Sequence, residues 1–152
     1  MITQYKPFLI KKIKDNSIVR DSTEWGIMVK HIPFNIYPDM KDLSSYDWKD
    51  QNGIEEFIPD NPTYKAYDIE CEFLFIGEHG TANDKIRSFI SYLSTDGYFS
   101  IYDTYTKIGR TKVRYVSNSP DVLYRRDNSD DKVIFKLSLK VTDPISEIIL
   151  SK

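Results

Sequence analysis

Residues 67–77 read YDIECEFLFIG, and apolar side chains alternate with acidic ones along most of this stretch. A period of two is typical of a β-strand that buries one face and exposes the other. The predicted buried face holds Tyr67, Ile69, Cys71, Phe73 and Phe75, and the predicted exposed face holds Asp68, Glu70 and Glu72. A fold must therefore cover the first face and tolerate three carboxylates in a row on the second.

Other stretches also predict β-structure, which agrees with an aromatic content of 14%. KPFLIKKIKDNSIVRDS (6–22) predicts a hairpin with its turn at 15–17. WGIMVKHIPF (25–34) predicts a strand that begins near Trp25 and stops at Pro33. Two or three later strands are predicted in GYFSIYD (97–103), GRTKVRYVS (109–117) and KVIFKLSLKV (132–141).

One amphipathic helix is predicted at about 82–94, with Thr81 or Asn83 as its cap. Its apolar stripe has the spacing i, i+3, i+4, i+7 and consists of Ile86, Phe89, Ile90 and Leu93. The predicted fold class is mainly β (α+β), a β-sandwich or partly open barrel with this helix on its flank. We expect residues 1–152 to form a single domain.

A long loop at about 35–61 interrupts the pattern, and loops of this length are usually functional or disordered. Its aromatic residues argue against disorder, so we interpret it as an oligomer interface with apolar anchors and a charged rim. The predicted interface residues are Trp48, Asp50, Gly53, Glu55, Glu56, Phe57 and Ile58. The alternative is that the loop folds back over its own sheet as a lid.

Two explanations remain open for the acidic stripe of Asp68, Glu70 and Glu72. Basic residues on neighbouring strands could form a cross-strand charge ladder with it. These residues are Lys112, Arg114, Lys132, Lys136 and Lys140. In a ring, the same acids could instead line a lumen and repel passing DNA.

The sequence offers no catalytic or metal-binding constellation. There are two histidines and one cysteine, Cys71, which we expect to be buried, and no metal-ligand spacing or phosphate-binding glycine loop. We therefore expect a non-enzymatic protein without cofactors. A net charge of −2 gives no reason to expect stable nucleic-acid binding. No apolar run is long enough to span a membrane, so we expect a soluble protein.

The order of these features resembles the opening half of phage distal tail proteins. The resemblance lies in DSTEWGIMVKHIPF (21–34), DWKDQNGIEEFIP (47–59), KAYDIECEFLFIG (65–77) and FKLSLKVTDP (135–144). Within these stretches the family's Gly-hydrophobic pair corresponds to Gly26-Ile27, and its closing Asp-Pro to Asp143-Pro144.

The resemblance implies a β-sandwich with a helix, a fold shared with tail-tube proteins. It also implies a virion structural protein, made in the bacterial cytoplasm, that forms a hexameric ring at the tail tip. Other tail and baseplate proteins would be its partners, in a phage or prophage. Many family members carry a carbohydrate-module-like second domain. Since this chain ends soon after Pro144, we expect no glycan binding of that kind.

Three alternatives to a distal tail hub remain. A tail-tube or terminator subunit of a contractile injection machine is similar in the same features. From a different class, a small ligand-binding β-barrel would have the same strand pattern. A hydrolase could use the loop carboxylates at Asp47, Asp50, Glu55 and Glu56.

Overall fold

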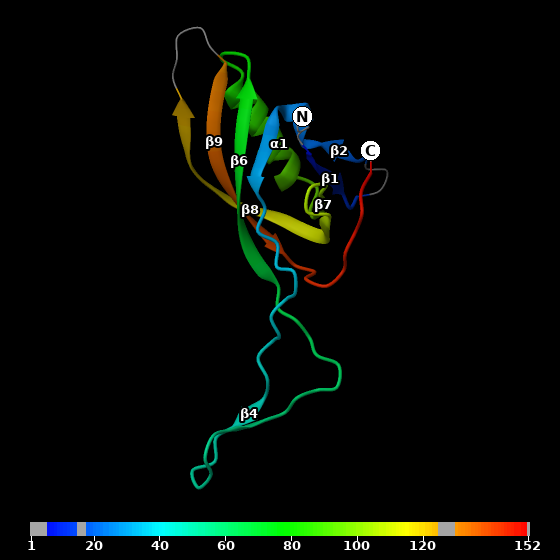
Figure 1. The fold of residues 1–152 in the computed structure, drawn as a ribbon, viewed down its shortest axis with the longest axis vertical. Coiled ribbons are helices and arrows are strands. Elements are labelled where there is room, and N and C mark those ends of the chain that lie inside the picture. The colour runs from blue at the N-terminus through cyan, green and yellow to red at the C-terminus, as the bar shows by residue number, and fades with distance from the viewer. Residues whose placement is uncertain (1–5, 15–17, 125–129, 152) are drawn as a thin grey trace, which may run out of the picture.

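The computed structural model describes residues 6–14, 18–124 and 130–151, and its largest element is a seven-stranded antiparallel sheet (Figure 1). The strand order is β2-β1-β7-β8-β9-β6-β3. The strands of this sheet are β1 (Phe8–Lys12), β2 (Arg20–Asp21), β3 (Ile27–His31), β6 (Tyr67–Gly77), β7 (Phe99–Asp103), β8 (Ile108–Tyr124) and β9 (Asp131–Val141). A separate pair consists of β4 (Ser45–Tyr46) and β5 (Glu55–Glu56).

The large sheet curls over on itself. Strand β8 is 17 residues long; its first part pairs with β7, its later part pairs with β9, and the register shifts along it. The rings of Phe8 on β1 and Phe73 on β6 have centroids 5.3 Å apart, although β7, β8 and β9 separate these strands in the sheet. The prediction of a mainly β fold, sandwich-like with one helix, is therefore confirmed.

The core lies inside this curl and follows the predicted alternation. On β6, Cys71 pairs with Leu137 of β9, and Phe73 pairs with Phe135. All four side chains are buried, as are Val133, Leu139 and Val141 on the same face of β9. Burial of apolar surface contributes roughly 25 cal/mol per Å², so two strands with matched apolar faces stabilise the curl strongly.

Helix α1 (Ala82–Ser94) packs into the open side of the curl, with the bounds that the sequence predicts. Phe89 and Leu93 are fully or almost fully buried. The Phe89 ring lies 5.9 Å from that of Phe73 and 5.3 Å from that of Trp25. The helix therefore closes the core between β6 and the segment before β3.

Both ends of α1 are held by charged residues from distant strands. Asp131 accepts hydrogen bonds from the backbone N–H groups of Gly80 and Ala82, at 2.9 and 3.2 Å. Thr81, one of the two predicted caps, is the N-cap residue, but its side chain makes no capping hydrogen bond. At the other end, the buried Lys12 donates to the carbonyls of Leu93, at 3.1 Å, and Thr95. Burial lowers the pKa of Lys12, and Asp96 partly opposes that shift.

The chain before β3 differs from the expected continuous strand. Ser22–Trp25 form a short 3-10 helix, η1, so the predicted start of the strand at Trp25 was wrong. Gly26 follows with φ +70°, and a Cβ there would lie 2.9 Å from the carbonyl oxygen of Ile76. The glycine thus permits a left-handed turn against β6. The predicted β1–β2 hairpin is confirmed, whereas its turn at 15–17 lies outside the described residues.

The C-terminal segment covers the outer face of the β1–β7 region. Leu150 is buried with Leu9 and Tyr102, and Ile148 packs beside them. Gly109 makes the close approach possible, because a Cβ there would lie 1.9 Å from the Ile148 carbonyl oxygen. These strands are therefore buried on both faces.

Candidate assembly surface

Residues 32–66, between β3 and β6, leave the body as one long projection, which we call the arm (Figure 1). Its root is fixed to the body. Ile32 and Phe34 are buried, and Arg110 of β8, only 2% exposed, donates to the carbonyl oxygen of Asn35 at 2.7 Å. The Arg110 guanidinium also lies 5.7 Å from the centroid of the Phe34 ring. The arm therefore starts from a rigid base.

The two limbs of the arm stay together beyond the root. Met40 and Tyr64 form an antiparallel bridge. The N–H of Lys41 donates to the carbonyl of Thr63 at 2.9 Å. The hydroxyls of Tyr37 and Tyr64 lie 2.8 Å apart, and this hydrogen bond raises the pKa of Tyr64. The arm is thus longer than the predicted loop at 35–61.

The outer part of the arm is a small hairpin in which β4 pairs with β5. The ring centroids of Tyr46 and Trp48 are 4.2 Å apart, and Trp48 donates to the Glu55 carboxylate at 3.2 Å. Gly53 has φ +78°, as the turn at the end of this hairpin requires. The sequence did not predict this hairpin, because each of its strands is two residues long and too short to show an alternating pattern.

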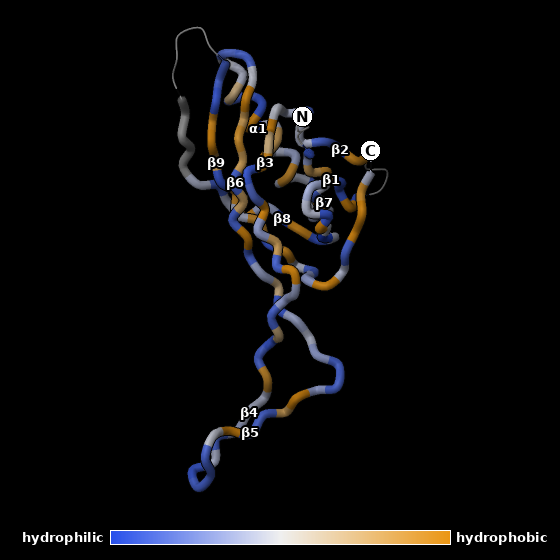
Figure 2. Tube along the Cα trace, in the orientation of Figure 1, coloured by the Kyte–Doolittle hydropathy of each residue, from blue (hydrophilic) through white to orange (hydrophobic). Residues whose placement is uncertain are grey.

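All seven residues predicted for the interface lie on this outer part and are exposed. Phe57 and Ile58 are 70% and 69% exposed, and Trp48 is 46% exposed. Figure 2 shows hydrophobic stretches along the arm, outside the body. The alternative of a lid is wrong, because the arm projects away from the sheet and does not cover it (Figure 1). The interface role itself stays a prediction.

The outer part of the arm is also strongly acidic. Residues 42–60 hold six acidic residues and one lysine, a net charge of −5 in a chain whose total is −2. These acids alternate with the exposed apolar residues. A partner surface should therefore combine apolar groups with positive charge.

The acidic stripe of β6 has the cross-strand register of a ladder but few ion pairs. Asp68 pairs with Lys140, Glu72 with Lys136, and Glu70 with Ser138. Glu72 is the member that forms ion pairs within 4 Å among the described residues. Its partners are Lys30, at 3.4 Å, and the Nδ1 atom of His31, at 3.8 Å. In the described part of the chain, none of the basic residues predicted for the ladder lies within ion-pair distance of the stripe, so the ladder was wrong as ion pairs. A lumen role for Asp68, Glu70 and Glu72 stays a prediction.

Cys71 has the character of a core residue. It is fully buried, and burial, with a smaller contribution from Glu70, raises the pKa of its thiol to about 12. A thiol with so high a pKa is protonated at neutral pH and is a poor nucleophile. Glu55 and Glu56, suggested for hydrolysis, are both exposed at the outer part of the arm.

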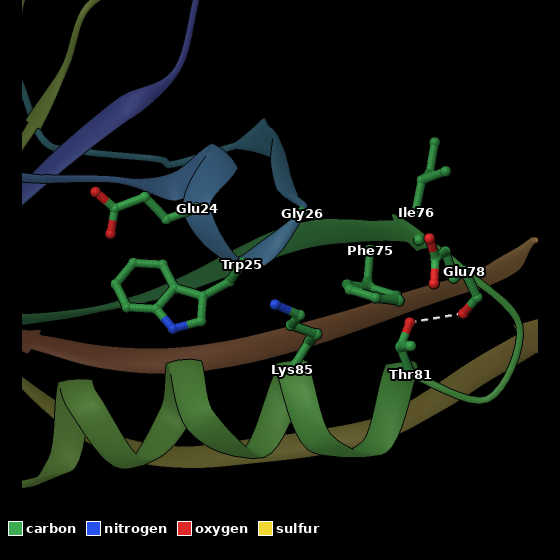
Figure 3. Close-up of a pocket in the computed structure, with 9 residues that line it drawn as sticks. Glu24, Trp25, Gly26, Phe75, Ile76, Glu78, Thr81 and Lys85 are labelled. Atoms are coloured by element: carbon green, nitrogen blue, oxygen red, sulfur yellow. Dashed lines mark hydrogen bonds between the residues drawn. The ribbon is translucent and has the colours of Figure 1, made fainter.

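A hollow of about 300 Å³ lies between η1, the end of β6 and the start of α1. Figure 3 shows Lys85 and Phe75 reaching into it, beside Trp25 and Gly26. Thr81 donates to the carbonyl of Glu78 at its rim, at 2.6 Å.

The described residues include no group of three or more His, Cys, Asp or Glu that could hold a metal ion. In the same part of the chain, no helix is long and apolar enough to cross a membrane.

The fold defined by these elements is a curled antiparallel sheet closed by one helix. A solved structure of the Dit protein (gp 19.1) of SPP1 has a similar fold, with a TM-score of 0.57 and 14% sequence identity. That protein is described as a paradigm of the hub adsorption apparatus in phages that infect Gram-positive bacteria. The match covers 90% of this chain and 50% of that one, so the chain spans half the length of its structural neighbour. No family model and no curated protein matches the sequence.

Proposed function

We propose that the protein is a structural subunit of a phage or phage-like tail, acting as a ring-forming hub or tube subunit at the tail tip. Two independent likenesses support the proposal. The order of sequence features resembles phage distal tail proteins, and the fold is similar to that of a phage hub protein. Under this proposal the protein is a virion component that is assembled in the bacterial cytoplasm.

The arm is the observation that carries the proposal. A chain that acts alone gains nothing from holding Trp48, Phe57 and Ile58 in water on a projecting hairpin. Aromatic anchors surrounded by charged residues have the composition of a binding hot spot with its polar rim. The arm therefore serves to bind another subunit.

The function is geometric and not enzymatic. Identical subunits that each place an arm on the next one form a heterologous interface, and such interfaces close into rings when the rotation closes. The resemblance to distal tail proteins implies six subunits. Neighbouring tail and baseplate proteins would bind the two faces of the ring.

The test is the native mass of the protein with and without its arm. In the truncated variant, a Gly-Ser-Gly linker replaces residues 41–63, because Met40 and Tyr64 already lie opposite each other. We expect a ring-sized multiple of 17.8 kDa for the full chain and a monomer for the truncated one. Circular dichroism of the truncated variant serves as the folding control.

A full chain that stays monomeric or dimeric at all concentrations would contradict the proposal. That result would favour the small ligand-binding barrel or the hydrolase. A truncated variant that still forms the same ring would instead remove the arm from the assembly mechanism.

A further inference from the structure

A second exposed apolar surface lies at the end of the β1–β2 hairpin, and we call it the hairpin patch. Its apolar members are Ile13, Ile18 and Tyr98, which are 48%, 73% and 42% exposed. The N–H of Ile13 donates to the carbonyl of Tyr98 at 3.3 Å, so β1 and the residue before β7 lie side by side here. Ile13 and Tyr98, far apart in the sequence, therefore lie next to each other at this end of the sheet.

The hairpin patch lies in a basic part of the chain. Residues 6–20 contain five basic residues and one acidic residue. Among them, Lys11 on β1 and Lys14 just after β1 are exposed. The Arg20 guanidinium lies 4.2 Å from the centroid of the Trp25 ring, which fixes that charge in place.

Two acidic residues at the edge of the patch are each bound to one of its cations. Glu24 accepts from Arg20 at 2.9 Å, and Asp96 forms an ion pair with Lys14 at 3.4 Å. The Lys14–Asp96 pair is exposed, and such pairs contribute little and can be exchanged for stronger partners, whereas the Arg20–Glu24 pair is about one-third exposed. A hollow of about 460 Å³, lined partly by Ile18, Arg20 and Tyr92, lies between these groups.

We propose that the hairpin patch of one subunit receives the outer part of the arm of the neighbouring subunit. This inference rests on the proposed function and names the surface that the arm binds. The arm offers exposed apolar side chains among acids, with a net charge of −5 over residues 42–60, and the patch offers exposed apolar side chains among cations. Charge complementarity of this kind selects the partner and fixes its register.

The positions of the two surfaces fit a closed ring. In one chain the arm projects from the body at the end remote from the β1–β2 hairpin (Figure 1). The contact is therefore made between copies, head to tail, which is the arrangement that cyclic symmetry uses. The acidic stripe of β6 is a poorer receiving surface, because Asp68 and Glu70 would face the acids of the arm.

Charge reversal on each side tests the pairing. The arm variant carries Asp50→Lys and Glu56→Lys, and the patch variant carries Lys11→Glu and Lys14→Glu. All four positions are exposed, so both variants should unfold at the wild-type temperature. We expect each variant alone to self-associate about 100-fold or more weakly, because like charges then meet at the contact.

Mixing the two variants is the decisive measurement. In an equimolar mixture the substituted side chains of each arm meet the oppositely charged substituted side chains of a patch, and the wild-type arm meets the wild-type patch, so we expect rings to return with the two chains alternating. A chain that carries all four substitutions should also assemble. Asp68→Lys on the β6 stripe is the matched control and should assemble like the wild type.

The outcomes separate the two proposals. If the arm variant is monomeric while the patch variant forms wild-type rings, the hairpin patch is not the receiving surface, although the proposed function stands. The inference also fails if both variants are monomeric and their mixture does not assemble. A wild-type chain that never assembles overturns both.

Discussion

The body and the arm use the same kinds of residue in opposite ways. In the body, Phe73, Phe89 and Phe135 pack ring against ring and are shielded from water. In the arm, Trp48 and Phe57 are exposed although they are just as apolar. The difference follows from spacing, because aromatic residues with the period of a strand or helix share one face and can be covered by the same chain. Those without a sustained period stay available to another chain.

The largest expected effect compares a phenylalanine in each region. Phe73→Ala should lower the free energy of unfolding by about 3–5 kcal/mol, since it removes a buried ring and leaves a cavity. Phe57→Ala should change it by less than about 0.5 kcal/mol, as expected for an exposed residue. Urea unfolding at concentrations where the chain is monomeric measures both. Equal losses would mean that the arm packs on its own body in solution.

The reactivity of a cysteine towards a thiol reagent compares how accessible the body and the arm are to solvent. Cys71 should not react with a bulky thiol reagent at pH 8 until the protein unfolds, because the thiol is buried and its pKa is raised to about 12. Phe57→Cys in a Cys71→Ala background should react at once in the monomer and slowly in the ring. Rapid labelling of native Cys71 would contradict its place in the core.

The same thiol gives a pH dependence with a definite sign. The folded chain keeps the Cys71 proton above the ordinary thiol pKa of 9.0, whereas the unfolded chain loses it. The contribution of the protonated Cys71 thiol to the free energy of unfolding is fully present below pH 9. It is lost as the pH rises from 9 towards 12. Cys71→Ser, which buries a hydroxyl, should cost about 1–3 kcal/mol. Cys71→Ala should abolish this part of the alkaline loss, which denaturant titrations at pH 8 and 10 would reveal.

A smaller effect is expected at the helix, which the arm does not touch. Asp131→Ala should cost about 1–2 kcal/mol, because the backbone N–H groups of Gly80 and Ala82 lose their acceptor at the positive end of α1. Asp131→Asn, which keeps an acceptor but removes the charge, should cost less. Thermal unfolding of the two variants measures the difference. If Asp131→Ala costs nothing, the helix end is held by other groups.

The smallest effect is expected on the acidic stripe. Glu72→Gln should cost at most about 1 kcal/mol, because it removes a partly exposed ion pair with Lys30. Asp68→Asn, with no ion pair among the described residues, should be neutral within about 0.5 kcal/mol. A clear gain in stability for Asp68→Asn would show that the stripe is kept at a cost to the monomer, as a lumen surface would be.

The sequence predicted a strand or helix correctly where a side-chain pattern runs the full length of that element. The pattern at 67–77 located β6 and its buried face, the pattern at 132–141 located β9, and the stripe from Ile86 to Leu93 located the helix. Cys71 was placed correctly for the same reason. The hairpin within residues 35–61 was not predicted, because strands of two residues are too short to show a side-chain period.

Contacts between distant residues could not be read from local patterns. Neither the helix caps at Lys12 and Asp131 nor the burial of Arg110 beside Asn35 has a signal in the neighbouring sequence. The packing of Leu150 on Leu9 and Tyr102 has no local signal either. The residues predicted for the interface are exposed on the arm. The hairpin patch has no signal in the local sequence, because Ile13, Ile18 and Tyr98 come from separate segments of the chain.

The pairing of β1 with β7 has a consequence for how the chain folds. Ile10 lies opposite Ile101, and Lys12 reaches the end of a helix 81 residues further along the chain. Contacts between such distant segments form slowly, because a long loop must close before any of them is made. During synthesis β1 therefore lacks its longer pairing partner until β7 has left the ribosome, and before then it can pair only with the short β2. Until then its free edge is open to pairing with other nascent chains.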